Sequence, residues 1–338
     1  MRTLLLSTVA LLATGVAAQA QDVTLRLSHW LPAQHAVPQT GLVEWTESIT
    51  EASGGTITFD IYPAQQLGSA PDHYDMTRDG IADVGYVNPG YTAGRFPIYE
   101  LTGVPFLALD GMNSAKAIHE WYQGDHAAAE MSDVYFCLVN PHEPGRFHGK
   151  AEIRVPEDVR GLNVRPAHST MARFVSSLGA SSVQVPAPEA REALERGTAD
   201  AVTFPYEAME VFNVGEVTKF HNDMPLYLSS QVMLFNQNTF DGLSDDQRQV
   251  IDDHCTPDWS LRFSEGWSEY DKGVRDSIIN DPEHTVYTPT DEEVALWRAA
   301  AEPTLEAWKS DATDAGHDAD AILQGLRDAL AANGTLYE

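Results

Sequence analysis

The sequence predicts an α/β fold in which two βαβ lobes face each other across a central ligand cleft. The first observation is residues 160–209, where strand-like and helix-like patterns alternate: LNVRP, an apolar helical face ending at Gly179, SSVQVP, a helix between Pro188 and Gly197, and ADAVTFP. Such alternation is typical of a parallel sheet. Ligands bind beyond the carboxyl ends of parallel strands, and Arg165 and Phe204 stand at two such ends.

The second observation is that the same pattern occurs earlier in the chain. A strand (VTLRLSHW), a helix over about 37–52, a strand (TITFDIYP), a helix (DHYDMTRDG) and a strand (IADVGYVNP) follow in the same order. The segments RDGIADV and ERGTADAV agree in detail, because a glycine ends each helix and Ala-Asp opens the next strand. The comparison matches His29 and Trp30 with Arg165, and Asn88 with Phe204. The alternative is that a glycine at a helix end followed by the start of a strand is common in α/β folds, so that the chain contains no true repeat.

The third observation is length, since 338 residues suit two ordinary domains. Residues 1–20 read as a secretory signal peptide, with a positive Arg2, an apolar stretch too short to span a membrane, and cleavage after Ala20. We expect lobe I to contain residues 21–130 and about 215–250. We expect lobe II to contain residues 131–214 and part of 251–338, with C-terminal helices packing across both lobes.

Between and after the two units, further elements follow. Residues 113–131 read as one helix, VYFCLVNP as a strand, and residues 217–240 as two strands that return to lobe I. From Ser244 onward the pattern is helical, and we expect Pro257, Pro282, Pro289 and Pro303 to break it into pieces.

Composition narrows the possible functions. The formal net charge of −29 argues against nucleic acids and anionic membrane surfaces as partners. The two cysteines, Cys137 and Cys255, allow either one disulfide or two buried thiols. The sequence contains no HExxH, CxxC, GxSxG, Walker or GxGxxG motif, so no metal site, cofactor or catalytic centre is predicted. Two similar lobes and an export signal without a catalytic motif favour a binding protein over an enzyme.

Several stretches resemble a known family. YPAQQLGSAPDHYDMTRDGIADVG, VPFLALDGMNSA, IRVPEDVRGLNVRPAHST, LGASSVQVPAPEAREALERGTADAV and GLSDDQRQVIDD are similar, in the same order, to the DctP-like solute-binding proteins of tripartite ATP-independent periplasmic (TRAP) transporters. The resemblance implies a periplasmic binding protein-like fold that closes on a small solute. It also implies a monomer in the periplasm that delivers a carboxylate-bearing organic acid to a membrane permease. A zwitterion or amine held near Glu207, a ligand-sensing role and a secreted enzyme remain the alternatives.

The resemblance also implies a carboxylate clamp. The family's arginine in the GLKxR strand corresponds to Arg165, and a less regular second arginine corresponds to Arg146. A guanidinium suits this role because its planar fork holds a carboxylate through two bonds. The alternative for each arginine is a structural ion pair. Where many members have asparagine this chain has Phe204, and Asn88 replaces the acidic residue of the sialic-acid-binding branch. The further candidates for the pocket are His29, Trp30, Tyr86, Tyr227 and His73.

Overall fold

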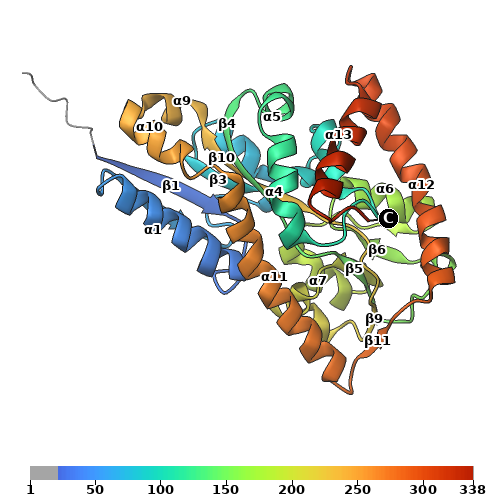
Figure 1. Ribbon diagram of the computed structural model, residues 1–338. Helices are drawn as coiled ribbons and strands as arrows, with labels where there is room; N and C mark the ends of the chain where they lie inside the picture. Colours follow the sequence, from blue (N-terminus) through green and yellow to red (C-terminus); the bar gives the residue numbers. More distant parts are fainter. Residues whose placement is uncertain (1–21, 338) are drawn as a thin grey trace, which may run out of the picture.

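The computed structural model describes residues 22–337, which form two sheets with helices packed around them (Figure 1). The predicted signal peptide lies outside the described residues. The first sheet has the order β2-β1-β3-β10-β4, and the second has the order β11-β9-β5-β8-β6-β7. The strands of the first sheet are β1 (Val23–His29), β2 (Ile57–Tyr62), β3 (Val84–Val87), β4 (Val134–Pro141) and β10 (Ser230–Asn236). Those of the second are β5 (Arg146–Gly149), β6 (Asn163–Arg165), β7 (Ser181–Ser182), β8 (Ala201–Phe204), β9 (Phe220–Asn222) and β11 (Thr285–Tyr287).

Helices connect these strands and cover them. In the first lobe they are the π-helix η1 (Val37–Leu42), α1 (Val43–Ala52), α2 (His73–Arg78), α3 (Pro97–Glu100), α4 (Gly111–Tyr122), α5 (Asp125–Glu130), α9 (Gln237–Gly242) and α10 (Asp245–Asp252). In the second they are α6 (Ser169–Ser177), α7 (Ala190–Glu195) and α8 (Glu207–Val211). The C-terminal helices are α11 (Pro257–Asn280), α12 (Asp291–Asp314) and α13 (Ala319–Ala332).

The two lobes are built on the same βαβ plan. Strands β1, β2 and β3 are parallel, as are β6, β7 and β8. The aspartate of each predicted repeat caps the neighbouring strand in the same way. Asp83 accepts a bond from the backbone N–H of Arg26 at 2.9 Å, and Asp200 accepts one from that of Asn163 at 2.8 Å. The glycine before each one has a positive φ, which ends the preceding helix.

The register corrects the predicted equivalences by one residue. Ser28 pairs with Gly85, and Arg165 pairs with Val202. Gly85 and Val202 each lie two residues after the repeat aspartate of their own lobe. The counterpart of Arg165 is therefore Ser28 and not His29. Because successive strand residues point to opposite faces, a shift of one position changes which side chains are comparable.

The predicted lobe boundaries differ from the sheets at two strands. Strand β4, predicted in lobe II, pairs antiparallel with β10 in the first sheet. Strand β9, predicted in lobe I, pairs with β5 and β11 in the second. Two loops therefore carry the chain between the sheets, at residues 142–145 and 223–229, and helix α11 carries it across again between β10 and β11. Both loops are short, because β10 lies between β3 and β4 in the first sheet, and β9 lies beside β5 in the second.

Long C-terminal helices tie the lobes together. Helix α11 packs against η1, α4 and β4 of the first lobe and against α8 and β11 of the second, and Figure 1 shows it running diagonally across the molecule. It begins at Pro257, as the proline pattern predicts, with Thr256 accepting a bond from the backbone of Trp259. Helix α12 packs against α3, α6 and α13.

Two helix predictions were wrong in detail. Residues 113–131 form two helices and not one, because Gly124, at a φ of 82°, separates α4 from α5. Pro303 does not break its helix but lies inside α12. Pro303 and Ala299, whose carbonyl loses its partner, are both exposed, so water can replace the missing hydrogen bond.

Cys137 and Cys255 form a disulfide with a Cα–Cα distance of 4.6 Å and a separation of 118 residues. The bond links β4 to the turn that precedes α11. Of the two states that the sequence left open, the structure shows the bonded one.

Candidate functional site

A cavity lies between the two lobes and is lined by residues that follow the strand ends of both sheets. Its empty volume, which includes the solvent at its opening, is about 350 Å³. Arg165 and Phe204 come from the ends of β6 and β8, and Trp30 and Asn88 follow β1 and β3. These four predicted site residues meet in one place. The other lining residues are His35, Tyr91, His142, Ala167, Ala187, Pro205, Glu207, Phe212, Ser229, Gln231 and Trp267.

The guanidinium of Arg165 is buried in this cavity, and no carboxylate of the described residues pairs with it. The residue is 1% exposed. Its Nε donates to the carbonyl of Val185 at 3.0 Å, and its Cζ lies 4.3 Å from the centre of the Phe204 ring. Among residues 22–337, Nη1 has no hydrogen-bond partner and no carboxylate pairs with the group.

Burial therefore lowers the pKa of Arg165, and nearby Tyr91 and Tyr227 oppose that shift. An arginine keeps its proton in proteins, so this is a buried cation. An unpaired buried cation is costly, and an anion that enters the cavity removes that cost.

Aromatic rings form the walls of the cavity. The Trp30 and Tyr91 rings meet edge-on with centres 5.8 Å apart, and the Phe204 and Phe212 rings stack at 5.8 Å. The indole of Trp267 on α11 closes the space from a third direction. Such walls suit a flat, apolar body.

A second polar group lines the same cavity, and it belongs to a different element from Arg165. Glu207, at the start of α8, places Oε2 3.5 Å from Nε2 of His35, and both side chains are 3% exposed or less. The backbone N–H of Glu207 donates to Asp271 at 2.8 Å, and burial raises the pKa of Asp271 to about 7. The rings of His35 and His142 both meet Trp267 edge-on, at 5.0 and 5.5 Å.

Arg146, the predicted second clamp, does not line the cavity. Its Nε lies 3.1 Å from Oδ1 of Asp223, and its Nη1 donates to the carbonyl of Pro144 at 2.6 Å. Arg275 pairs with the same aspartate from α11. The structural ion pair, which was the alternative for this residue, is therefore what the structure shows.

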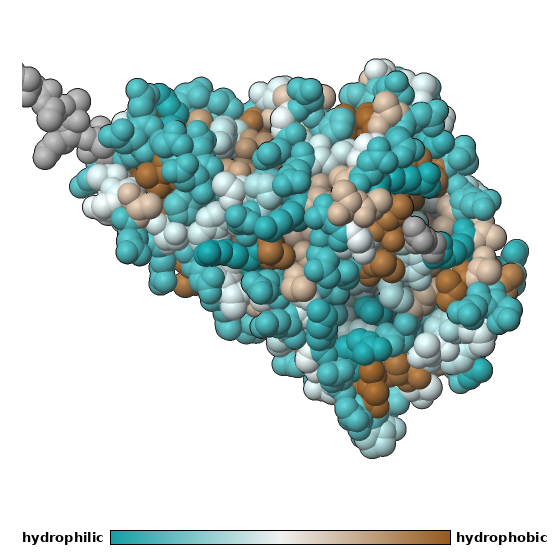
Figure 2. All heavy atoms as spheres, viewed as in Figure 1, coloured by the Kyte–Doolittle hydropathy of each residue, from teal (hydrophilic) through white to brown (hydrophobic). Residues whose placement is uncertain are grey.

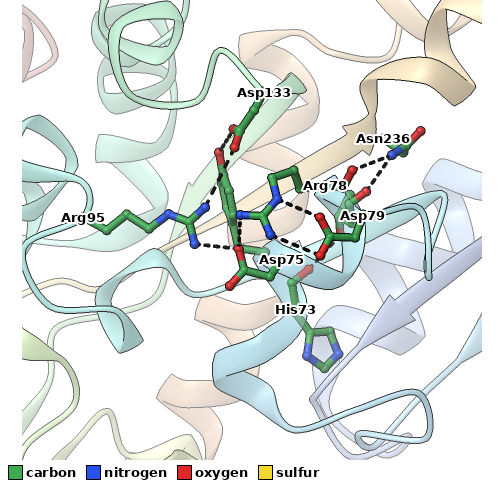
Figure 3. A network of polar contacts seen from close by, with 9 residues as sticks. His73, Asp75, Arg78, Asp79, Arg95, Asp133 and Asn236 are labelled. Carbon is green, nitrogen blue, oxygen red and sulfur yellow. Dashed lines mark hydrogen bonds and ion pairs between the residues drawn. The ribbon is translucent and has the colours of Figure 1, made fainter.

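Four other predicted site residues also lie outside the lining. His73 donates from Nδ1 to the carbonyl of Ser69 at 2.9 Å, and its Nε2 lies 3.1 Å from the Ser28 hydroxyl. Figure 3 shows its ring pointing away from the ion pairs of α2, where Arg78 and Arg95 meet Asp75. Both ring nitrogens of His73 are therefore already used within the protein.

The remaining three are core residues. Tyr86 bonds through its hydroxyl to the side chain of Asn140 at 3.2 Å and stacks on Phe263. Tyr227 packs edge-on against His142. His29 is 1% exposed, and burial lowers its pKa to about 4.

A chain of three histidines, which we call the histidine chain, lies behind Phe204. His148 Nε2 donates to the Phe204 carbonyl at 3.0 Å, so its Nδ1 accepts from His221 Nδ1 at 2.7 Å. His221 Nε2 then accepts from His284 Nδ1 at 2.8 Å, and Lys219 donates to His284 Nε2 at 3.2 Å. Burial lowers the pKa of His148 to about 3 and that of His221 to about 2, so the chain is neutral.

Sequence reasoning missed several cavity residues. Tyr91 lies just after a strand end, which could have marked it. Trp267 belongs to a buried stripe with Trp259 and Phe263 at helical spacing, but the sequence cannot say which neighbour the stripe faces. His35 and Phe212 carry no signal of their own. Among the described residues, no group of three or more histidine, cysteine, aspartate or glutamate side chains could hold a metal ion, and no helix is long and apolar enough to cross a membrane.

Two lobes that enclose a small cavity, with a buried cation that no described carboxylate pairs, define a receptor for a small solute. Comparison with known proteins identifies the family. The chain belongs to the bacterial extracellular solute-binding proteins, family 7 (DctP), which it matches over residues 27–311. The predicted family, fold class and role as a binding protein rather than an enzyme are thereby confirmed. The protein is a solute-binding protein of the TRAP type, and such proteins work with a membrane permease.

Solved structures of the same type are similar over nearly the whole chain. A TRAP solute-binding protein from Rhodoferax ferrireducens T118, in complex with copurified benzoate, has a TM-score of 0.87 and 30% identity and covers 92% of this chain and 98% of its own. A marine metagenome protein specific for aromatic acid ligands, with 3-hydroxybenzoate, has a TM-score of 0.87 and 27% identity over 93% and 99%. The outer membrane transporter protein TsaT of Comamonas testosteroni is 25% identical over 97% of this chain and 98% of its own.

Proposed function

We propose that this protein captures a small carboxylate with a flat, aromatic body between its lobes and presents it to a TRAP permease. The observation that carries the proposal is Arg165, whose Nη1 is buried in the cavity and has no partner among residues 22–337. A ligand carboxylate would neutralise the guanidinium and would take up its free N–H donors. Trp30, Phe204 and Asn88 are the other predicted contacts that line the same space.

The aromatic body of the ligand is supported by two observations. The cavity walls consist largely of ring faces, which pair favourably with a planar apolar group. The two similar structures hold benzoate and 3-hydroxybenzoate, which are both small aromatic acids. A clamp arginine at the edge of an aromatic cavity matches the chemistry of such molecules.

The proposal also includes the location and the assembly state of the protein. The protein is exported to the periplasm by residues 1–20, which are removed after Ala20, and it acts there as a monomer. The apolar h-region and the Ala-Gln-Ala cleavage pattern support export. The face seen in Figure 2 is mostly hydrophilic, and its apolar groups are small and separate, so this face offers no large apolar surface for a second copy.

The test is calorimetry on the mature protein with benzoate and with benzamide, its neutral analogue of the same shape. We expect benzoate to bind and benzamide to bind at least about thirtyfold more weakly, because only the carboxylate pairs with Arg165. Equal affinities for the two compounds would contradict a carboxylate clamp. A wider set of aromatic and aliphatic acids in a thermal-shift screen then identifies the preferred solute.

A further inference from the structure

The cavity contains polar atoms that a benzoate-like carboxylate does not use. Besides Arg165, five lining residues have an unpartnered buried atom within residues 22–337: Trp30 at Nε1, His35 at Nε2, Glu207 at Oε2, Gln231 at Oε1 and Trp267 at Nε1. Each of these five residues is almost completely buried. Polar atoms in such places nearly always have a partner, so five of them around one space indicate that a ligand supplies it.

The tautomer of His35 follows from its backbone contact. The N–H of Val37 donates to Nδ1 of His35 at 3.1 Å, so Nδ1 carries a lone pair and the proton is on Nε2. His35 is therefore neutral and offers a donor to the cavity. Its Nε2 lies 3.5 Å from Oε2 of Glu207, too far for a good hydrogen bond. A donor and an acceptor thus stand close together without satisfying each other.

This pair is separate from the clamp. Arg165 is held by Val185 and lies over Phe204, whereas Glu207 is held through its backbone by Asp271. Among the described residues, Arg165 and Glu207 form no ion pair with each other. One ligand can therefore meet both groups through different ends.

The combination of donors and an acceptor selects a particular chemical group. A hydroxyl donates one hydrogen bond and accepts others, so it can donate to Oε2 of Glu207 and accept from Nε2–H of His35 or Nε1–H of Trp267. An ammonium group can only donate, and it would leave both N–H groups unpaired. A methyl group would satisfy none of the three.

We propose that Glu207 and His35 form a second pole of the binding site, which recognises a hydroxyl group on the ligand away from its carboxylate. The inference rests on the proposed function and deepens it, because it makes the solute a hydroxylated acid. Of the two unpartnered acceptors in the lining, Glu207 Oε2 and Gln231 Oε1, we assign the discrimination to Glu207, because its Oε2 lies beside the donor of His35. A site built to bond a hydroxyl rejects analogues that lack one.

The experiment is calorimetry with matched pairs of acids on the wild-type protein. The pairs are 3-hydroxybenzoate with 3-methylbenzoate and 4-hydroxybenzoate with 4-methylbenzoate, which differ in polarity but little in size. We expect at least one hydroxy acid to bind about tenfold or more tightly than its methyl partner. If both methyl acids bind within about threefold of their hydroxy partners, the second pole is wrong although the carboxylate clamp stands.

Variants then assign the preference to Glu207. Glu207→Leu should reduce the preference to below about threefold, while Glu207→Gln, which keeps an acceptor oxygen, should retain part of it. Glu210→Gln on the exposed face of the same helix is the control and should leave the preference unchanged. A full preference in Glu207→Leu, shown to be folded by circular dichroism, would overturn the assignment.

Two further outcomes separate the proposals. Tightest binding of 3-(aminomethyl)benzoate would mean that the pole recognises an ammonium group, and the hydroxyl assignment would be wrong. Binding of none of the acids would instead remove the proposed function, and the second pole with it.

Discussion

Replacing Arg165 by methionine should abolish tight binding without weakening the fold. Methionine keeps much of the apolar stem and removes the charge. In the complex the substitution removes one partner of a buried charge pair, which costs about 2–5 kcal/mol. At about 1.4 kcal/mol per decade this is roughly a thirtyfold to several-thousandfold loss of affinity.

The ligand-free protein should respond differently. The variant loses the bond to the carbonyl of Val185, worth about 1 kcal/mol, and the contact with the Phe204 ring, worth about 1–2 kcal/mol. It also no longer buries an unpaired cation, which costs several kcal/mol. The free energy of unfolding without ligand should therefore equal or exceed that of the wild type.

Arg146→Met is the matched control, because Arg146 is a buried arginine whose charge is already paired. It should lower the free energy of unfolding by about 3 kcal/mol, since Asp223 keeps only Arg275. Calorimetry with benzoate and denaturant unfolding without ligand measure both quantities. Binding of benzoate by Arg165→Met within about threefold of wild type would refute the clamp. A larger affinity loss in Arg146→Met than in Arg165→Met would exchange their roles.

Three further predictions concern stability. Cys137→Ser should lower the free energy of unfolding by about 5 kcal/mol on the chain-entropy model for a loop of this length, and two alkylated cysteines in unreduced periplasmic protein would show that no bond forms. Because the pKa of His221 is depressed in the folded protein, its contribution to the free energy of unfolding is complete above the unfolded pKa of about 6.5. That contribution is lost as pH falls toward the folded value of about 2. When the pH is lowered from 7.5 to 5, the free energy of unfolding should thus fall by about 2 kcal/mol more in the wild type than in His221→Leu. Equal decreases in the two proteins would contradict this. Asp271, with its raised pKa, becomes more stabilising as pH falls, and it does so in both proteins. Pro303→Ala should raise the free energy of unfolding by about 1–3 kcal/mol by restoring the bond to Ala299, and an unchanged melting temperature would show that α12 is already relaxed there.

The sequence predicted the features that depend on local patterns. The two βαβ units, the glycines that end their helices and the start of α11 at Pro257 were all readable, because turn chemistry and apolar periodicity act over a few residues. Arg165 was readable as well, since its place at a strand end follows from the same pattern. The family resemblance pointed to the same residue.

The errors concern partners that are distant in sequence. Strand β4 was placed in the wrong lobe because its neighbour, β10, lies about 90 residues away, and pairing across such a distance leaves no mark in either strand. His73 was expected in the cleft, but its Nε2 lies 3.1 Å from the hydroxyl of Ser28 on β1, a residue 45 positions away in the sequence. Pro303 was read as a helix end, although tertiary packing of Trp297 and Trp308 keeps α12 continuous on both sides of it.

The two arginines show why a site cannot be read from residue types alone. Arg165 and Arg146 are both buried, both lie at strand ends of the second sheet, and both stack on an aromatic ring. What separates them is Asp223, which follows β9 and neutralises Arg146 but lies out of reach of Arg165. A charge that the fold has already paired contributes to stability, while one that it leaves unpaired raises the energy of the empty state and lowers that of the occupied one. The absence of a counter-charge is therefore the property that distinguishes the candidate clamp, and it becomes visible only when every acidic side chain of the described chain has been placed in space.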